Sequence, residues 1–264
     1  MLSPEQQAYF ETFGFLILRQ AFSAKETADI TYDFDEVLAA DPGGQVFPGE
    51  KRQAVLGCIE RRPVLTHLVE SDVIFEAMEQ WLGLDFVWVG SDGNLYVGDT
   101  RWHSDTSHIS YRRIKVAFYL DLVTQDTGGL RVIPGSHRAP LNENLKALTA
   151  VPVPASTALG VPARDIPSFP LESRPGDLVM FDQNTWHASF GGKTGWRMFT
   201  LNFASKPNTP EHEAILRKTY AGNVAYTQTM QFTHSDRIYE DAFLHSDRPR
   251  TRNMTEKLVE FGFR

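Results

Sequence analysis

The sequence has one cysteine, Cys58, no long apolar run and no excess of positive charge. A single cysteine excludes an intrachain disulfide and a zinc site built on several cysteines. No stretch approaches the roughly 18 apolar residues of a membrane span, so we expect no membrane segment. The formal net charge of −7 argues against nucleic acid or an anionic membrane as the main partner, because both attract a basic surface.

The beginning of the chain lacks the basic and apolar regions of a signal peptide, so we expect a cytoplasmic protein. Its 264 residues are within what one hydrophobic core can support, which predicts a single domain over 1–264. We expect three parts in it: N-terminal helices over about 3–82, a β core over about 85–205 and a C-terminal helical extension over about 206–264.

Local signals place the first elements. Two capping boxes, Ser3–Gln6 and Ser23–Glu26, predict helix starts, and the second helix is expected to run to about Ala40. A short strand is predicted over 13–18, and one helix over 64–82.

The central part is rich in short β-type runs bounded by Gly, Pro and Asp. Strand–helix alternation is missing there, which makes a parallel doubly wound sheet a poor fit. The pattern therefore predicts a mainly β fold with flanking helices, a β-sandwich or jelly roll. A loop is expected over 150–170. The predicted strands cover 86–89, 94–97, 114–123, 130–133, 178–181 and 196–203.

Three side chains suggest a metal site. His103 and Asp105 are two residues apart, so on a strand they would point to the same face. His187 follows near the end of another predicted strand. If the two strands face each other, the three side chains form a 2-His-1-carboxylate triad with open coordination positions. A structural zinc site would be closed by a fourth ligand instead.

Arg197 follows His187 by ten residues, on the next predicted strand. Its guanidinium can hold a carboxylate through two parallel hydrogen bonds. We therefore expect it to bind the far carboxylate of a keto acid such as 2-oxoglutarate, whose other end would chelate the metal.

Four segments resemble the phytanoyl-CoA dioxygenase (PhyH) family, over about residues 5–205. They are Thr127–Gly129, the following Leu130–His137, Trp102–Asp105, which is similar to the family's iron-binding motif, and the turn Pro175–Asp177. The resemblance implies a double-stranded β-helix (jelly roll, cupin-like). It also implies Fe(II), 2-oxoglutarate and O₂ as cofactor and co-substrates, and oxidation, most often hydroxylation, of an unactivated C–H bond with release of succinate and CO₂.

The same resemblance implies two residue roles. Ser189 matches a hydroxyl position that helps to bind 2-oxoglutarate beside Arg197. Asp105 occupies a position that halogenating relatives fill with a small residue, so its presence favours oxygen transfer or desaturation.

Five residues are candidates for the substrate pocket, each with a structural alternative such as core packing or a loop hydrogen bond: Asn94, Tyr96, Trp102, His108 and Lys115. Four basic residues surround the His-x-Asp segment, namely Arg101, Arg112, Arg113 and Lys115. A solvated face is the ordinary interpretation of such a group. If one of them points inward, and Lys115 is the first candidate, an anionic substrate group becomes attractive.

Two other functions stay open at this point. The same triad could activate water on Zn(II) in a cupin-like hydrolase or isomerase, which would have no use for Arg197 as a clamp. The scaffold could also serve a non-catalytic sensor, although such proteins usually lose a ligand. We expect a small-molecule substrate, polar or anionic, and the C-terminal helices could form a homodimer interface.

Overall fold

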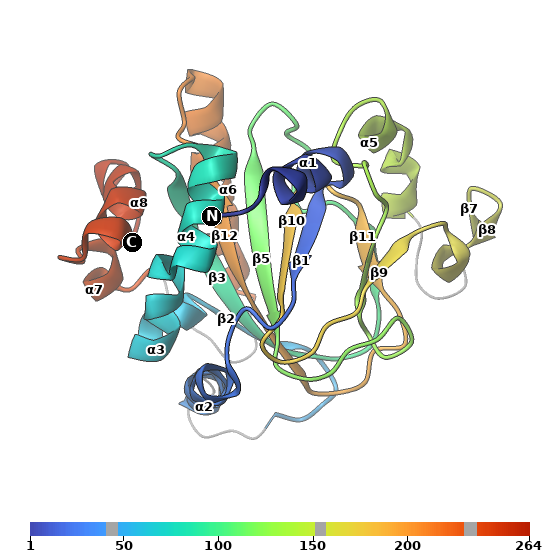
Figure 1. The fold of residues 1–264 in the computed structure, drawn as a ribbon, viewed down its shortest axis with the longest axis horizontal. Helices are drawn as coiled ribbons and strands as arrows, with labels where there is room; N and C mark the ends of the chain where they lie inside the picture. Colours follow the sequence, from blue (N-terminus) through green and yellow to red (C-terminus); the bar gives the residue numbers. More distant parts are fainter. Residues whose placement is uncertain (41–46, 151–156, 230–236) are drawn as a thin grey trace.

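The computed structural model describes residues 1–40, 47–150, 157–229 and 237–264, and two antiparallel sheets form its centre (Figure 1). The larger sheet contains, in spatial order, β1 (Phe15–Leu18), β10 (Leu178–Asp182), β5 (Arg113–Tyr119), β12 (Trp196–Ala204), β3 (Val87–Tyr96) and β2 (Gln53–Leu56). The smaller contains β4 (Thr100–His103), β11 (His187–Ser189), β6 (Leu130–Val132) and β9 (Phe169–Leu171). A separate pair is β7 (Thr157–Ala158) with β8 (Val161–Pro162).

Helices precede, interrupt and follow the sheets. The α-helices are α1 (Pro4–Phe13), α2 (Ala24–Ala40), α3 (Pro63–Thr66), α4 (Asp72–Leu82), α5 (Leu141–Asn144), α6 (Pro210–Thr227), α7 (Asp241–Leu244) and α8 (Pro249–Glu260). The 3₁₀ turns are η1 (Cys58–Arg61), η2 (His67–Glu70), η3 (Lys146–Ala150) and η4 (Ala163–Asp165). Among the helices of the described ranges, none is long and apolar enough to cross a membrane.

The predicted helix starts are confirmed. Ser3 accepts a hydrogen bond from the Gln6 amide while the Gln6 side chain accepts one from the Ser3 amide, which makes a capping box at α1. Ser23 and Glu26 make the same reciprocal contacts before α2, which ends at Ala40 as expected.

Two predicted elements differ from the structure. The helix expected over 64–82 is divided into α3, η2 and α4. Ser71 is extended (φ −63°, ψ 135°) before α4, and its carbonyl accepts from the amides of Ile74 and Phe75. The two strands expected over 86–89 and 94–97 are one strand, β3. Gly90, at φ 141°, lets the backbone pass through the middle while β12 pairs along the whole of β3.

The other differences are smaller. The strand expected over 114–123 ends at Tyr119. Strand β2 was not predicted and extends the edge of the larger sheet beside β3. The loop expected over 150–170 contains β7, β8 and η4 and ends in β9, which pairs with β6, while 151–156 lies outside the described residues.

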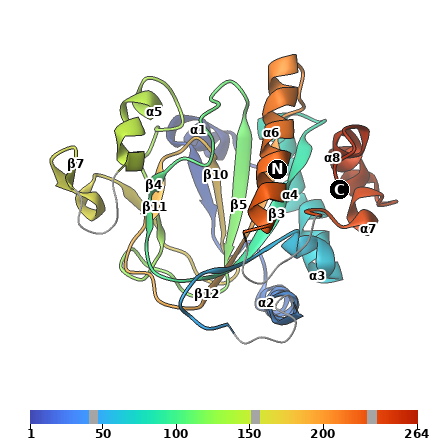
Figure 2. The same cartoon turned by 180° about the vertical axis from the view of Figure 1, so that it is seen from behind.

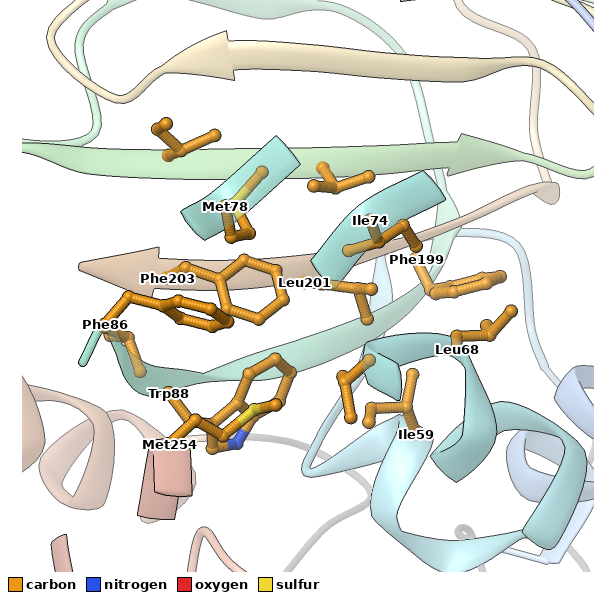
Figure 3. Close-up of a cluster of buried hydrophobic side chains, with 14 of the residues drawn as sticks. Ile59, Leu68, Ile74, Met78, Phe86, Trp88, Phe199, Leu201, Phe203 and Met254 are labelled. Atoms are coloured by element: carbon orange, nitrogen blue, oxygen red, sulfur yellow. The ribbon is translucent and has the colours of Figure 1, made fainter. Parts of the chain in front are cut away.

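The larger sheet has two unlike faces. The helix-covered face is the main core, in which aromatic side chains of β12 pack against helices and turns from both ends of the chain (Figure 3). Phe199, Leu201 and Phe203 are all fully buried there. Full burial of each of these side chains contributes about 1.5–3 kcal/mol to the free energy of folding. The face opposite to it turns toward the smaller sheet and lines a cavity.

Helix α6 stands beside β5 and β3, so the C-terminal part takes part in this inner space (Figure 2). The outer face of the smaller sheet is closed by a separate apolar cluster that includes Trp102, Trp186 and Phe190. The cavity is thus bounded by two sheets and one helix.

Candidate metal centre and its cavity

A cavity of about 560 Å³ lies between the two sheets and α6. This volume is within the range of roughly 300–1,000 Å³ of small-molecule sites. Its walls come from the inner faces of β3, β5 and β12, from β4 and β11 of the smaller sheet, and from one side of α6.

Three potential metal ligands meet at this cavity. His103 ends β4 and lies directly opposite His187, the first residue of β11. Asp105 follows in a turn rather than on a strand, and its amide donates to the Gln183 carbonyl at 2.9 Å. The Nε2 atom of each histidine lies 3.7 Å from Asp105 Oδ1, and the three ligand atoms are all within 4.8 Å of one another.

Backbone carbonyls fix the orientation of both imidazoles. Nδ1 of His103 lies 2.8 Å from the Arg101 carbonyl, and Nδ1 of His187 lies 2.8 Å from the Thr185 carbonyl. A carbonyl only accepts, so the proton is assigned to each Nδ1 and the Nε2 lone pairs point to the shared space. Burial and the neighbouring His103 lower the pKa of His187 to about 3, which keeps this imidazole neutral.

Lys115 orients the carboxylate. Its Nζ lies 2.7 Å from Asp105 Oδ2, so Oδ1 is the oxygen that faces the imidazoles. Burial would raise the pKa of Asp105, but the Lys115 ammonium outweighs burial and holds this pKa well below its usual range. Two neutral nitrogens and one anionic oxygen with open positions beside them fit Fe(II) of the 2-His-1-carboxylate type.

The prediction that Arg197 clamps a carboxylate in this cavity is wrong. Its side chain points to the opposite face of the sheet, where the guanidinium donates to Asp121 and Asp35, each at 2.8 Å. Successive strand residues alternate in direction, so the neighbour Met198 lines the cavity in its place. The ten-residue spacing from His187 placed Arg197 on the correct strand, but it did not tell to which face of the sheet its side chain points.

Trp102 is also corrected as a pocket residue. It adjoins His103 on β4 and therefore points outward, where its indole donates to the Ala163 carbonyl at 2.7 Å. Asn94 is fully buried and is not among the lining residues; its amide donates to Asp92 at 2.6 Å. The remaining candidates line the cavity, namely Ser189, Tyr96, His108 and Lys115.

The four basic residues around the His-x-Asp segment do not share one face: two point away from the cavity and two point into it. Arg101 is exposed, and Arg112 pairs with Glu11 outside the cavity. Arg113 and Lys115, two residues apart on β5, both face inward. The alternation along β5 could have indicated that these two share a face, but not that the face is the inner one.

Sequence reasoning missed several lining residues. Arg52, on the segment that leads into β2, donates to the Tyr96 hydroxyl at 3.2 Å and lies over the Tyr96 ring. Asp92, on β3, is held by the Thr200 hydroxyl and by Asn94. The C-terminal extension supplies six residues from α6, for which no motif gave a signal: Ile215, Lys218, Thr219, Gly222, Asn223 and Tyr226.

The sheets and the open triad together define a class, the double-stranded β-helix oxygenases that use iron and 2-oxoglutarate. The family model described as phytanoyl-CoA dioxygenase (PhyH) matches residues 10–198. The chain belongs to this family. It is a 2-oxoglutarate-dependent non-haem iron dioxygenase that uses O₂, and the predicted fold, reaction class and cofactors are confirmed.

Individual relatives agree with this membership. An ectoine dioxygenase of Bordetella parapertussis is 27% identical over 229 residues, which cover 74% of this chain and 72% of that protein. The structure of EctD from S. alaskensis with bound Fe has a TM-score of 0.60 at 25% identity, covering 77% of each chain. HygX from Streptomyces hygroscopicus with nickel and 2-oxoglutarate bound has a TM-score of 0.63 at 18% identity, covering 78% of this chain and 88% of that one.

Proposed function

We propose that His103, Asp105 and His187 bind the iron and that the enzyme hydroxylates a C–H bond of a small polar molecule in the cavity beside them. One observation carries the assignment: three ligand atoms from two strands and a turn lie within 4.8 Å of one another. Both imidazole Nδ1 atoms are already used by backbone carbonyls, which leaves the Nε2 atoms for a metal.

Iron bound there supplies the oxidation of the C–H bond, with 2-oxoglutarate and O₂ consumed and succinate and CO₂ released. The chain's own residues hold and shield the site. Lys115 keeps the Asp105 carboxylate ionised and turned toward the histidines. Phe181 packs edge-on against the His187 ring, with the ring centroids 5.0 Å apart, and excludes water from its side.

We infer that Ser189 and Arg52, which both line the cavity, bind 2-oxoglutarate. Ser189 is buried on β11, two residues after His187, and lines the cavity. Arg52 has no carboxylate partner among the residues described here. It lies on a stack in which Tyr96 and Trp196 are 4.4 Å apart between ring centroids. A guanidinium with free donors suits the far carboxylate, the role that Arg197 does not fill.

The substrate is proposed to be polar, because a hydrogen-bonded row of polar side chains lines the cavity beside the triad. Gln183 donates to Asn202 at 2.8 Å, Asn202 donates to Thr200 at 3.1 Å, and Thr200 donates to Asp92. Ectoine is the first compound to test, given the relatives named ectoine dioxygenase. The cytoplasmic location and the homodimer expected from the sequence stay predictions.

The iron assignment is tested by adding Fe(II) and then 2-oxoglutarate to metal-free protein under nitrogen. We expect a weak visible charge-transfer band that needs both components and is lost in His187→Ala. His245→Ala, at an exposed position outside the cavity lining, is the matched control and should keep the band. Iron bound without any band would favour the hydrolase or isomerase alternative, in which the triad serves Zn(II) and water.

The 2-oxoglutarate assignment is tested with two arginine variants. Titration of the same band should show a dissociation constant raised about 10-fold or more in Arg52→Met, because one charge-assisted pair is worth roughly 1.5–3 kcal/mol. Arg197→Met should leave this constant unchanged, since Arg197 points away from the cavity. The reverse result would restore Arg197 as the clamp.

A further inference from the structure

Arg113 is a buried cation without a counterion. It lines the cavity from the first position of β5 and is 8% exposed. One Nη donates to the Thr219 hydroxyl of α6 at 3.1 Å, and Nε has no acceptor. No carboxylate of the described residues forms an ion pair with it. Buried guanidinium groups are normally paired, because an unpaired buried charge strongly destabilises the folded state.

The carboxylates of the cavity wall are engaged elsewhere. Asp105 binds Lys115 through Oδ2 and turns Oδ1 toward the two histidines. Asp92 accepts from Thr200 and Asn94. The other ionisable groups in electrostatic range of Arg113 are Tyr111 and Tyr239, whose buried hydroxyls have raised pKa values and are neutral. Nothing on the wall therefore neutralises Arg113.

The cavity lining as a whole is also positively charged. It contains four cations, Arg52, Arg113, Lys115 and Lys218, against the two carboxylates Asp92 and Asp105. Iron(II) and the 2-oxoglutarate dianion cancel each other when both are bound. The cavity then keeps an excess positive charge in a protein whose net charge is −7. A positive cavity on an acidic protein attracts an anionic ligand selectively.

We infer that the substrate carries a carboxylate and that Arg113, with the Thr219 hydroxyl beside it, binds this group. The inference rests on the proposed function and names the class of substrate. Arg113 and Lys115 share a face of β5, so their Cα atoms are about 6.8 Å apart along the strand. Lys115 contacts the ligand Asp105, so a carboxylate on Arg113 holds the neighbouring carbons of a compact substrate close to the metal ligands.

Acetate is the probe, with acetamide as its uncharged counterpart of the same shape. Iron- and 2-oxoglutarate-loaded protein is titrated under nitrogen at constant ionic strength, with the melting temperature and the charge-transfer band followed together. We expect acetate, but not acetamide, to raise the melting temperature while the band persists. Arg113→Met should abolish this rise. Lys193→Met, which removes an exposed cation outside the cavity lining, should keep it.

The variants also separate binding from a structural role. Without ligand, Arg113→Met should be as stable as the parent or more stable, because a buried unpaired charge is removed. A melting temperature several degrees lower would assign Arg113 to the fold and overturn the inference. Should this variant not fold, Arg113→Lys keeps the charge but loses the planar fork, and a weakened response to acetate is again expected.

Two further results would contradict the inference. One is an equal response to acetate in the parent and in Arg113→Met. The other is loss of the charge-transfer band in Arg113→Met at 2-oxoglutarate concentrations that saturate the parent, which would place the co-substrate on Arg113. The acetate titration is repeated on metal-free protein, so a failure of the iron assignment does not hide the result at Arg113.

Discussion

Two arginines on neighbouring strands of the same sheet have opposite surroundings. Arg197, on β12, points to the helix-covered face and binds two aspartates. Arg113, on β5, points to the cavity and binds one hydroxyl. The outer face is closed by groups that the chain supplies itself, and the inner face presents charge that the chain leaves uncompensated. Arg197 therefore stabilises the fold, whereas we infer that Arg113 binds a ligand.

The largest difference, in iron content, is expected between substitutions of a carboxylate that faces the cavity and of one that faces away from it. Asp105→Ala should lower iron affinity and turnover by at least about 100-fold, because it removes a proposed ligand and leaves Lys115 unpaired. Asp121→Ala, which removes the partner of Arg197, should keep the full iron content. Iron content by metal analysis checks both. Full iron content in Asp105→Ala would remove the triad from consideration.

A smaller difference is expected between two neighbours on β12. Phe199→Ala should lower the free energy of unfolding by about 3–5 kcal/mol, because this ring is fully buried in the packed face. Met198→Ala enlarges a cavity that already exists and should cost at most about 2 kcal/mol. Urea denaturation measures both variants. Equal losses would mean that the two faces are packed equally tightly.

The outer ion pairs are expected to contribute less. Arg197→Met should lower the free energy of unfolding by about 1–2 kcal/mol, because the lost pairs are partly exposed and solvent screens them. Salt should reduce the difference from the parent. A difference that does not change between low and high salt would assign the loss to packing instead.

The smallest effect is expected on the smaller sheet. Trp102→Phe removes the hydrogen bond to the Ala163 carbonyl and should cost about 1 kcal/mol. Because Trp102 faces outward, the dissociation constants of iron and 2-oxoglutarate should match those of the parent. A weaker constant for either one would show that the outer cluster positions His103.

The sequence by itself determined the elements that depend on local signals. Capping residues at Ser3 and Ser23 set the first helices, and the order of short strands predicted a β-sandwich or jelly roll with flanking helices. The short motif around His103 and Asp105 together with His187 indicated a metal site, because few residues at close spacing suffice to define one. The family resemblance predicted the iron and the co-substrates 2-oxoglutarate and O₂.

Only the tertiary structure decided which way the side chains of the strands point. A shift of one residue turns a side chain to the opposite face, so Arg197 and Trp102 lie outside the cavity although their neighbours Met198 and His103 line it. Contacts between distant segments brought in Arg52 from the edge of the sheet and Thr219 from α6. Such contacts depend on how strands and helices pack in space, and no local pattern in the sequence encodes them.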